Sequence, residues 1–162
     1  MCRSICNNYA NNLIDNNIEN IHFNKFPDAH ARQIKYYAKW SIENGEADSI
    51  VINAGTNDIN YDNEPSVEQI STRVLDIARQ AKQMGVANIY VCGLIYRKQR
   101  SFDHIIRDIN LAIRLVSSAE GFIYISNDNI NRSDLHGDGL HLNPEGTEKL
   151  LENILSNTCP SF

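Results

Sequence analysis

Residues 49–58 read Ser-Ile-Val-Ile-Asn-Ala-Gly-Thr-Asn-Asp, and this stretch decides the fold. Its β-branched run, Ile50 to Ile52, is apolar without alternation, as in a parallel strand with both faces covered. Directly after it, Gly55-Thr56-Asn57-Asp58 supplies turn-forming and polar residues. The stretch therefore predicts a buried strand that delivers polar side chains at its carboxyl end.

Strand and helix patterns alternate on both sides of this stretch. Strands are predicted over 18–24, 88–93 and 122–125, and helices over 29–43, 67–84, 102–116 and 144–156, with a weakly helical pattern over 3–14. Such alternation predicts an α/β fold of three layers, α/β/α, around a parallel sheet. Right-handed crossovers place the carboxyl ends of all strands at one edge, where ligands bind in such folds.

Length and composition predict a single domain spanning residues 1–162, with 42% hydrophobic and 22% charged residues. The longest apolar runs are too short for a membrane span, and no secretory signal is visible, so we expect a cytoplasmic (intracellular) protein without a membrane partner. The net charge of −5 makes nucleic acid an unlikely partner. The basic cluster 97–100 is interpreted as a solvated loop, with contact to an anionic substrate or RNA as the alternative.

The four cysteines are scattered, so neither a disulfide framework nor a zinc site is predicted. Cys92 lies inside a predicted strand and is expected in the core. His136, Asp138 and His141 could be drawn as a metal triad, but no further ligand is evident. We therefore expect no metal and no cofactor.

The run Asp138-Gly139-Leu140-His141 places a carboxylate and an imidazole in one turn, with two residues between them. A carboxylate that binds one imidazole nitrogen fixes the tautomer and lets the other nitrogen act as a general base. Taken alone, Asp-Gly is also a common surface turn before an N-capped helix. Asn57, at the end of the 49–54 strand, offers an amide N–H to a developing oxyanion, and such donors lower a barrier by roughly 3 kcal/mol.

Gly-x-Asn-Asp followed late by Asp-x-x-His resembles blocks III and V of the SGNH (GDSL-type) hydrolases over nearly the whole chain. The runs 26–29, 93–97 and 134–143 resemble a narrower group, the SGNH esterase-like domains of retroelement-associated proteins. Under this resemblance His141 is the base and Asp138 its orienting acid. Asn57 is an oxyanion donor whose turn is shaped by Gly55 and Asp58.

Two parts of the family pattern differ in this chain. The narrower group typically reads Phe-Pro-Gly-Ala in block II, whose backbone N–H also faces the oxyanion, whereas this chain has Asp28. We therefore expect a carboxylate near the oxyanion and loss of the conformation that glycine allows.

The family nucleophile is the serine of a Gly-Asp-Ser run at the end of the first, central strand, and the sequence contains no such run. We expect an N-terminally incomplete domain that lacks this strand. Ser4, placed on the first helix, and Cys2 are the substitutes closest to the expected nucleophile position.

The resemblance implies hydrolysis of a small acyl ester, such as an acetyl ester, through a serine acyl-enzyme. Because the serine is missing, we expect this chain to be inactive or very weak. The alternative is a non-catalytic binding or assembly module of a retroelement-derived protein. In that case the sheet edge left by the missing strand would favour self-association.

Overall fold

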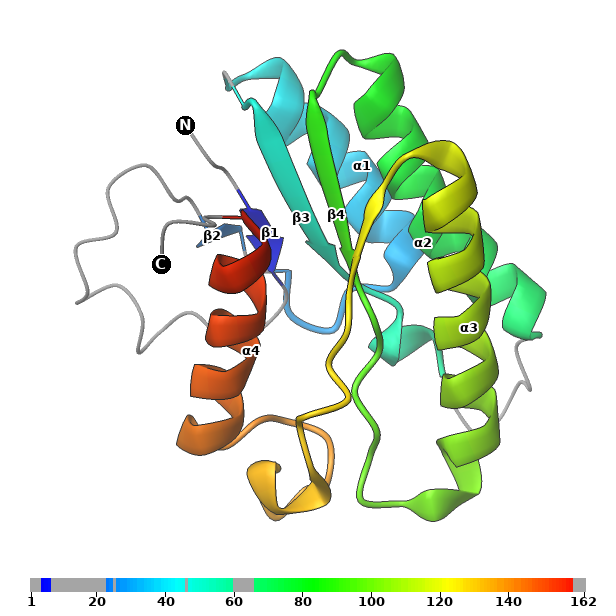
Figure 1. Ribbon diagram of the computed structural model, residues 1–162, viewed down its shortest axis with the longest axis vertical. Helices are drawn as coiled ribbons and strands as arrows, with labels where there is room; N and C mark the ends of the chain where they lie inside the picture. The colour runs from blue at the N-terminus through cyan, green and yellow to red at the C-terminus, as the bar shows by residue number, and fades with distance from the viewer. Residues whose placement is uncertain (1–3, 7–22, 25, 46, 60–65, 159–162) are drawn as a thin grey trace.

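The computed structural model describes residues 4–6, 23–24, 26–45, 47–59 and 66–158 (Figure 1). Within them, five strands form one parallel sheet in the order β2-β1-β3-β4-β5. The strands are β1 (Ser4–Cys6), β2 (Phe23–Asn24), β3 (Ser49–Asn53), β4 (Asn88–Cys92) and β5 (Ile123–Ile125). The helices are α1 (Ala31–Glu43), α2 (Val67–Gln83), α3 (Asp103–Glu120) and α4 (Pro144–Thr158), with 3-10 turns at Thr56–Asp58, Arg100–Phe102 and Arg132–Asp134.

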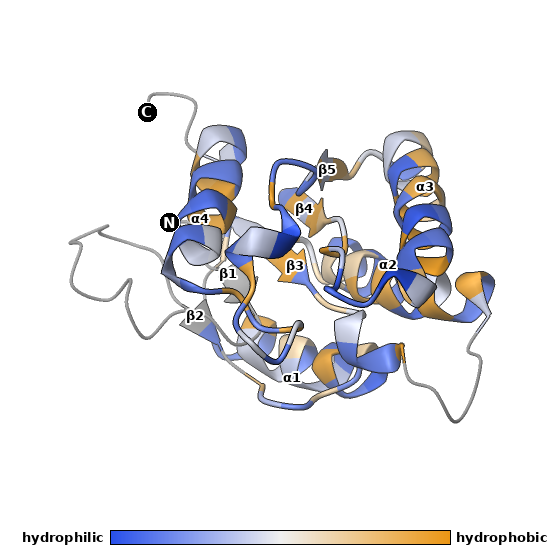
Figure 2. Cartoon of the chain, turned by 90° about the horizontal axis from the view of Figure 1, so that it is seen from below, coloured by the Kyte–Doolittle hydropathy of each residue, from blue (hydrophilic) through white to orange (hydrophobic). Residues whose placement is uncertain are grey.

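Helices cover both faces of the sheet. α1, α2 and α3 pack side by side on one face, and α4 lies on the other (Figures 1 and 2). Each face has its own cluster of buried apolar side chains. The structure therefore confirms the predicted α/β/α fold with a parallel sheet.

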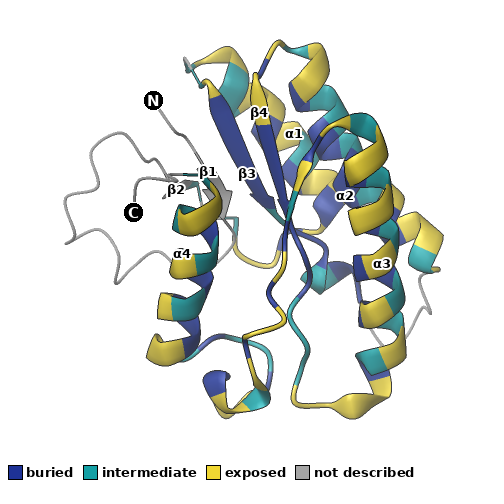
Figure 3. Ribbon diagram, viewed as in Figure 1, coloured by how far each residue is buried: buried dark blue, intermediate teal, exposed yellow. Residues whose placement is uncertain are grey.

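The central strands are buried because both of their faces are covered (Figure 3). In β3, Ile50 and Ile52 join the cluster under α1–α3, and Val51 between them joins the cluster under α4. The same alternation puts Val91 on one face and Cys92 on the other, so Cys92 is a core residue as predicted. An unbroken apolar run is thus the correct signature of this position.

Local sequence signals set the helix ends. The Ser66 hydroxyl accepts a hydrogen bond from the N–H of Gln69 at 3.0 Å, which caps α2. Gly121 ends α3 with φ of +80°, the left-handed C-terminal conformation. Among the described residues, no helix is both long and apolar enough to cross a membrane.

The N-terminal segment differs from the prediction. Residues 4–6 form strand β1 instead of helix, while the rest of the predicted helix, residues 7–14, lies outside the described residues. β1 pairs with β2 on one side and β3 on the other, so a short strand occupies an interior position of the sheet, where we expected a strand to be missing. The sheet therefore has no edge at this position, and its described edges are β2 and β5.

Candidate active site

A tight antiparallel turn carries the Asp-x-x-His run at the carboxyl edge of the sheet, the edge that Figure 2 faces. Leu135 and Leu142 pair across its base. The N–H of His136 donates to the carbonyl of His141 at 2.8 Å, and the N–H of Gly139 donates to the carbonyl of His136 at 3.0 Å. Gly139 has φ of +73°, a conformation that side-chain-bearing residues rarely adopt. The turn is therefore held by its own backbone.

Asp138 and His141 contact each other inside this turn. Asp138 Oδ2 lies 2.7 Å from His141 Nδ1, and Asp138 Oδ1 accepts hydrogen bonds from the N–H groups of Leu140 (2.9 Å) and His141 (3.0 Å). The Leu140 N–H, then the His141 ring and the His141 N–H, hold the pKa of the Asp138 carboxyl well below its usual range. An ionised carboxylate on Nδ1 keeps the proton there and leaves Nε2 for proton transfer. Both side chains are nearly half exposed, at 43% for His141 and 49% for Asp138.

The base of this turn is fixed to α4. The carbonyl of Asp134 accepts the N–H of Asn143 at 2.9 Å, and its carboxylate accepts Lys149 Nζ at 2.7 Å. Lys149, followed by the N–H of Asn131, lowers the pKa of Asp134. Because Asp134 is buried, this ion pair fixes where the turn begins.

The Asn57 turn follows β3 at the same edge. Gly55 has φ of +103°, and a Cβ built on it would lie 2.9 Å from Val74 Cγ2 of α2. The N–H of Asp58 donates to the carbonyl of Gly55 at 3.1 Å, which closes the 3-10 turn. Position 55 therefore requires glycine for two reasons: the backbone conformation and the close approach of α2.

The segment around Asp28 lies against the Asn57 turn. Asn57 Nδ2 donates to the carbonyl of Ala29 at 3.2 Å. The N–H of Ala29 donates to the carbonyl of Phe26 at 3.2 Å, and Pro27 and Asp28 occupy the middle of this turn. Asp28 has φ of +57°, so the expected loss of the glycine conformation is wrong: aspartate adopts the left-handed conformation here, which it tolerates better than most residues.

The carboxylate of Asp58 connects the Asn57 turn to two helices. Its carboxylate is fully buried and accepts the N–H of Ala31 at 2.8 Å and Arg73 Nη1 at 3.1 Å. His30 Nδ1 lies 3.9 Å away from the same carboxylate. Asp58 therefore joins the Asn57 turn to the first turn of α1 and to α2, contacts that the sequence spacing of 27 and 15 residues does not reveal.

Two consecutive residues after β4 link the two turns. Arg97 Nη2 donates to the carbonyls of Thr56 (2.5 Å) and Ile59 (3.0 Å) on either side of Asn57. The next residue, Lys98, donates its N–H to the carbonyl of Gly139 at 3.0 Å. The Asn57 turn and the Asp138–His141 turn are therefore positioned by the same short segment.

The interpretation of residues 97–100 as a solvated loop is only partly correct. Lys98, Gln99 and Arg100 are exposed, but Arg97 is half-buried with its guanidinium 5.0 Å from the Phe102 ring centroid. In the sequence, Arg97 is the member of this cluster that directly follows the apolar run 94–96, and this separates it from its exposed neighbours.

Strand β1 lies inside the sheet, between β2 and β3. Ser4 begins this strand and pairs with Phe23, so its predicted place on a helix is wrong. All strands are parallel, so the carboxyl end of β1 falls at Cys6. Cys2 and residues 7–22 lie outside the described residues, and the sequence from 7 to 22 contains no serine.

His136, Asp138 and His141, considered above as a metal triad, do not form a metal-binding group in the structure. Among the described residues, no three histidine, cysteine, aspartate or glutamate side chains gather closely enough to hold a metal ion. His136 is exposed and contributes its backbone N–H to the turn.

Fold and site together define an α/β/α domain with a carboxylate–imidazole pair at the carboxyl edge of its parallel sheet. The chain belongs to the GDSL-like lipase/acylhydrolase family, whose sequence pattern matches residues 10–149. Among curated proteins, none matches the chain.

Solved structures show the same fold at low sequence identity. A putative acylhydrolase from Bacteroides fragilis is 12% identical, with a TM-score of 0.82 over 99% of this chain and 86% of that one. A GDSL-like lipase from Bacteroides thetaiotaomicron is 14% identical, with a TM-score of 0.80 over 99% and 88%. A carbohydrate acetylesterase from Sinorhizobium meliloti is 14% identical, with a TM-score of 0.70 over 88% and 80%.

Proposed function

We propose that this chain carries the acid–base and oxyanion parts of an acyl-ester hydrolase site that takes a small acyl ester, such as an acetyl ester. His141 Nε2 is the base that accepts the proton of the nucleophile, and Asp138 holds the imidazole and stabilises its protonated form. The observation that carries the proposal is the 2.7 Å contact between Asp138 Oδ2 and His141 Nδ1. Both side chains are half exposed beside the carboxyl edge in a member of this family.

Asn57 can bind an oxyanion because one N–H of its side-chain amide is still available. One N–H of its amide binds the carbonyl of Ala29, which orients the group, and an amide has two N–H donors. The second donor and the backbone N–H of Asp28 are the two that we assign to the oxyanion. Asp28 adopts a left-handed φ, so the backbone of its turn keeps the conformation that a glycine would have there.

The missing component is the nucleophile. Because the sequence has no Gly-Asp-Ser run, we expect no hydrolysis that depends on His141. The test compares p-nitrophenyl acetate hydrolysis by the wild-type chain and by His141→Ala, and equal rates are expected. A clear wild-type rate that His141→Ala abolishes would show that another residue of the chain already serves as nucleophile.

The position of β1 suggests a gain-of-function experiment. β1 ends at Cys6, so the combined substitutions Asn7→Gly, Asn8→Asp and Tyr9→Ser put a Gly-Asp-Ser run directly after this interior strand. We expect this variant to hydrolyse p-nitrophenyl acetate, and we expect His141→Ala in the same background to remove the gain. Replacing Asp138 by Asn in that background should lower the hydrolysis rate by up to about 10⁴-fold, as loss of the orienting carboxylate does in other triads.

A second candidate function is a non-catalytic binding or assembly module, in the retroelement-associated setting that the narrower resemblance suggests. The specific observation in its favour is the pair of departures from the family pattern, Asp28 in block II and the lack of Gly-Asp-Ser. The gain-of-function variant distinguishes the two: a variant that folds and shows no His141-dependent rate favours the module.

A further inference from the structure

Strand β5 forms one edge of the described sheet, and its main chain faces outward there. Within the described residues β5 pairs with β4 alone. The carbonyl of Ile125 accepts the N–H of Gly93 of the β4 side at 2.9 Å, so the main-chain groups of Ile125 point toward β4. Because main-chain groups alternate in direction along a strand, the N–H and carbonyl of Tyr124 point away from β4, toward the open edge.

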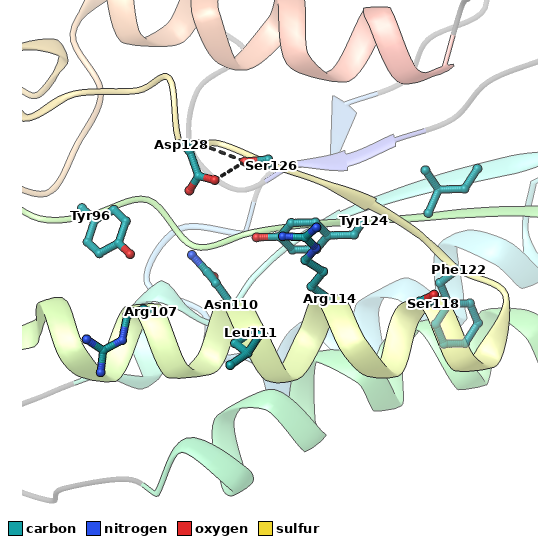
Figure 4. Close-up of a pocket in the computed structure, with 11 residues that line it drawn as sticks. Tyr96, Arg107, Asn110, Leu111, Arg114, Ser118, Phe122, Tyr124, Ser126 and Asp128 are labelled. Atoms are coloured by element: carbon teal, nitrogen blue, oxygen red, sulfur yellow. Dashed lines mark hydrogen bonds between the residues drawn. The ribbon is translucent and has the colours of Figure 1, made fainter.

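A groove of about 770 Å³ runs along this edge between α3 and β5 (Figure 4). Its lining includes Arg107, Leu111 and Arg114 of α3 and Ile123 and Tyr124 of β5. In Figure 4, the stretch of α3 that carries Arg107, Leu111 and Arg114 lies alongside the strand that carries Tyr124. None of the residues of the Asp138–His141 turn lines the groove.

Exposed apolar side chains flank the edge on both faces of β5. Tyr124 packs on the cluster under α3, the face from which Leu111 approaches, whereas Ile125 belongs to the cluster under α4. Ile123 lies two residues before Ile125 and so shares its face. Leu111 is 54% exposed and Ile123 is 41% exposed. Both side chains line the groove, so an added strand that occupies it would contact both.

The groove is positively charged on the α3 side. Arg114 makes no hydrogen bond or ion pair with any part of the chain that the structure describes, and Arg107 pairs only with its neighbour Asp108, at 2.9 Å. Burial, and to a lesser extent the carboxylate of Asp128, raises the pKa of Tyr124 to about 12, so its hydroxyl stays neutral. Asp128 accepts a hydrogen bond from the Ser126 hydroxyl at 2.7 Å.

We propose that the β5 edge binds an extended acidic peptide segment, which joins the sheet as a sixth strand with a carboxylate at Arg114 and apolar side chains over Ile123. Strand addition of this kind takes its affinity from main-chain hydrogen bonds and its specificity from alternate side chains. A second copy of this chain fits less well. Antiparallel pairing of two β5 strands about Tyr124 would bring both Arg114 side chains to the same two-fold axis, where they repel.

The test is a titration of the ¹⁵N-labelled full chain with the N-acetylated, C-amidated peptide TVEVDVT, followed by amide chemical shifts and hydrogen exchange. We expect the shift changes to be concentrated over residues 122–126, and the exchange of the Tyr124 amide to slow when the peptide is bound. Absence of these changes at millimolar peptide would overturn the proposal.

Two N-methylated peptides test the main-chain pairing. One carries the methyl groups on its valines and the other on the intervening residues, so each blocks one edge of the strand and keeps every side chain. One of the two should lose binding, and its identity reports the direction of the added strand. Retained binding by both would refute strand addition.

Charge reversal tests the contact at Arg114. Arg114→Glu should weaken binding by about threefold to tenfold, and Arg114→Gln by less, because an exposed ion pair contributes modestly. The control is Arg32→Glu, the same change at an exposed arginine of α1. An equal loss in Arg32→Glu would show non-specific charge attraction and overturn the proposal. So would a concentration-dependent dimer in sedimentation whose dissociation accompanies peptide binding, because the occupant would then be a second copy.

Discussion

The side-chain amide of Asn57 donates a hydrogen bond to the carbonyl of Ala29 across 3.2 Å. The adjacent residue Asp58 binds the N–H of Ala31 at 2.8 Å, so two consecutive side chains fasten the turn after β3 to the segment that enters α1. This connection orients Asn57, and Asp28, with its left-handed φ of +57°, lies in the turn that ends at the same Ala29. The residues of the proposed oxyanion site are therefore positioned by each other.

Replacing Asp28 tests the cost of this conformation. We expect Asp28→Gly to raise the free energy of unfolding by about 0.5–1 kcal/mol, because relief of the left-handed φ exceeds the added chain entropy of glycine. Asp28→Ala should lower it by about 1 kcal/mol, since alanine tolerates positive φ less well than aspartate. Urea denaturation measures both, and equal stability of the two variants would contradict the assignment.

Gly55→Ala should lower the free energy of unfolding by about 2–5 kcal/mol. The new Cβ meets an unfavourable φ of +103° and also lies 2.9 Å from Val74 Cγ2. The matched control is Gly121→Ala, where φ is +80° but no atom lies within 4 Å, so only the conformational cost of about 1–2 kcal/mol applies. Adding Val74→Ala to Gly55→Ala should cost less than the sum of the single changes; strict additivity would exclude the crowding.

Arg97→Lys and Arg97→Met should lower stability by about 1–3 kcal/mol, the methionine variant more, because Arg97 Nη2 binds the carbonyls of Thr56 and Ile59. The same variants should move the NMR signal of the Asn57 side-chain amide, which lies between these carbonyls in sequence. Arg100→Met, at an exposed neighbouring position, is the control and should change stability by no more than about 0.5 kcal/mol. An unmoved Asn57 signal in Arg97→Lys would disprove the link.

The stabilising effect of Asp138 should depend on pH. Its pKa is lowered in the folded chain, so its contribution is complete above the unfolded value of about 4 and is lost as the pH falls toward the folded value. We therefore expect Asp138→Ala to be less stable than wild type at pH 6–7 and the difference to shrink steadily below about pH 4. Urea denaturation at a series of pH values measures this difference, and a constant difference down to pH 2 would be inconsistent with the Asp138 contacts.

The fold was largely predictable because its signals are local. The unbroken apolar run of β3 and the Ser66 cap of α2 each act within a few residues, and the structure shows these elements where the patterns predicted them. The N-terminal strand was not predictable in this way. Three residues, Ser4–Cys6, are too few for a periodic pattern, and only their pairing with β2 and β3 makes them a strand.

The candidate site was predictable in its residues and not in its contacts. Asp138 and His141 are three residues apart, so turn chemistry alone could bring them together, and the structure places them 2.7 Å apart. Arg97 was not singled out, because its two carbonyl partners lie 41 and 38 residues away. No short-range pattern encodes contacts across such distances.

By itself, the sequence determined the α/β class, the order of the elements from α1 onward, and which residues stand at the carboxyl ends of β3 and β4, because periodicity and turn chemistry act over a few residues. Only the tertiary structure decided that β1 lies inside the sheet between β2 and β3, that Asp58 is buried, and that Asp28 takes a left-handed conformation. These features depend on which segments, distant in sequence, form hydrogen bonds with each other and bury each other's side chains. That choice is made by the packing of the whole chain.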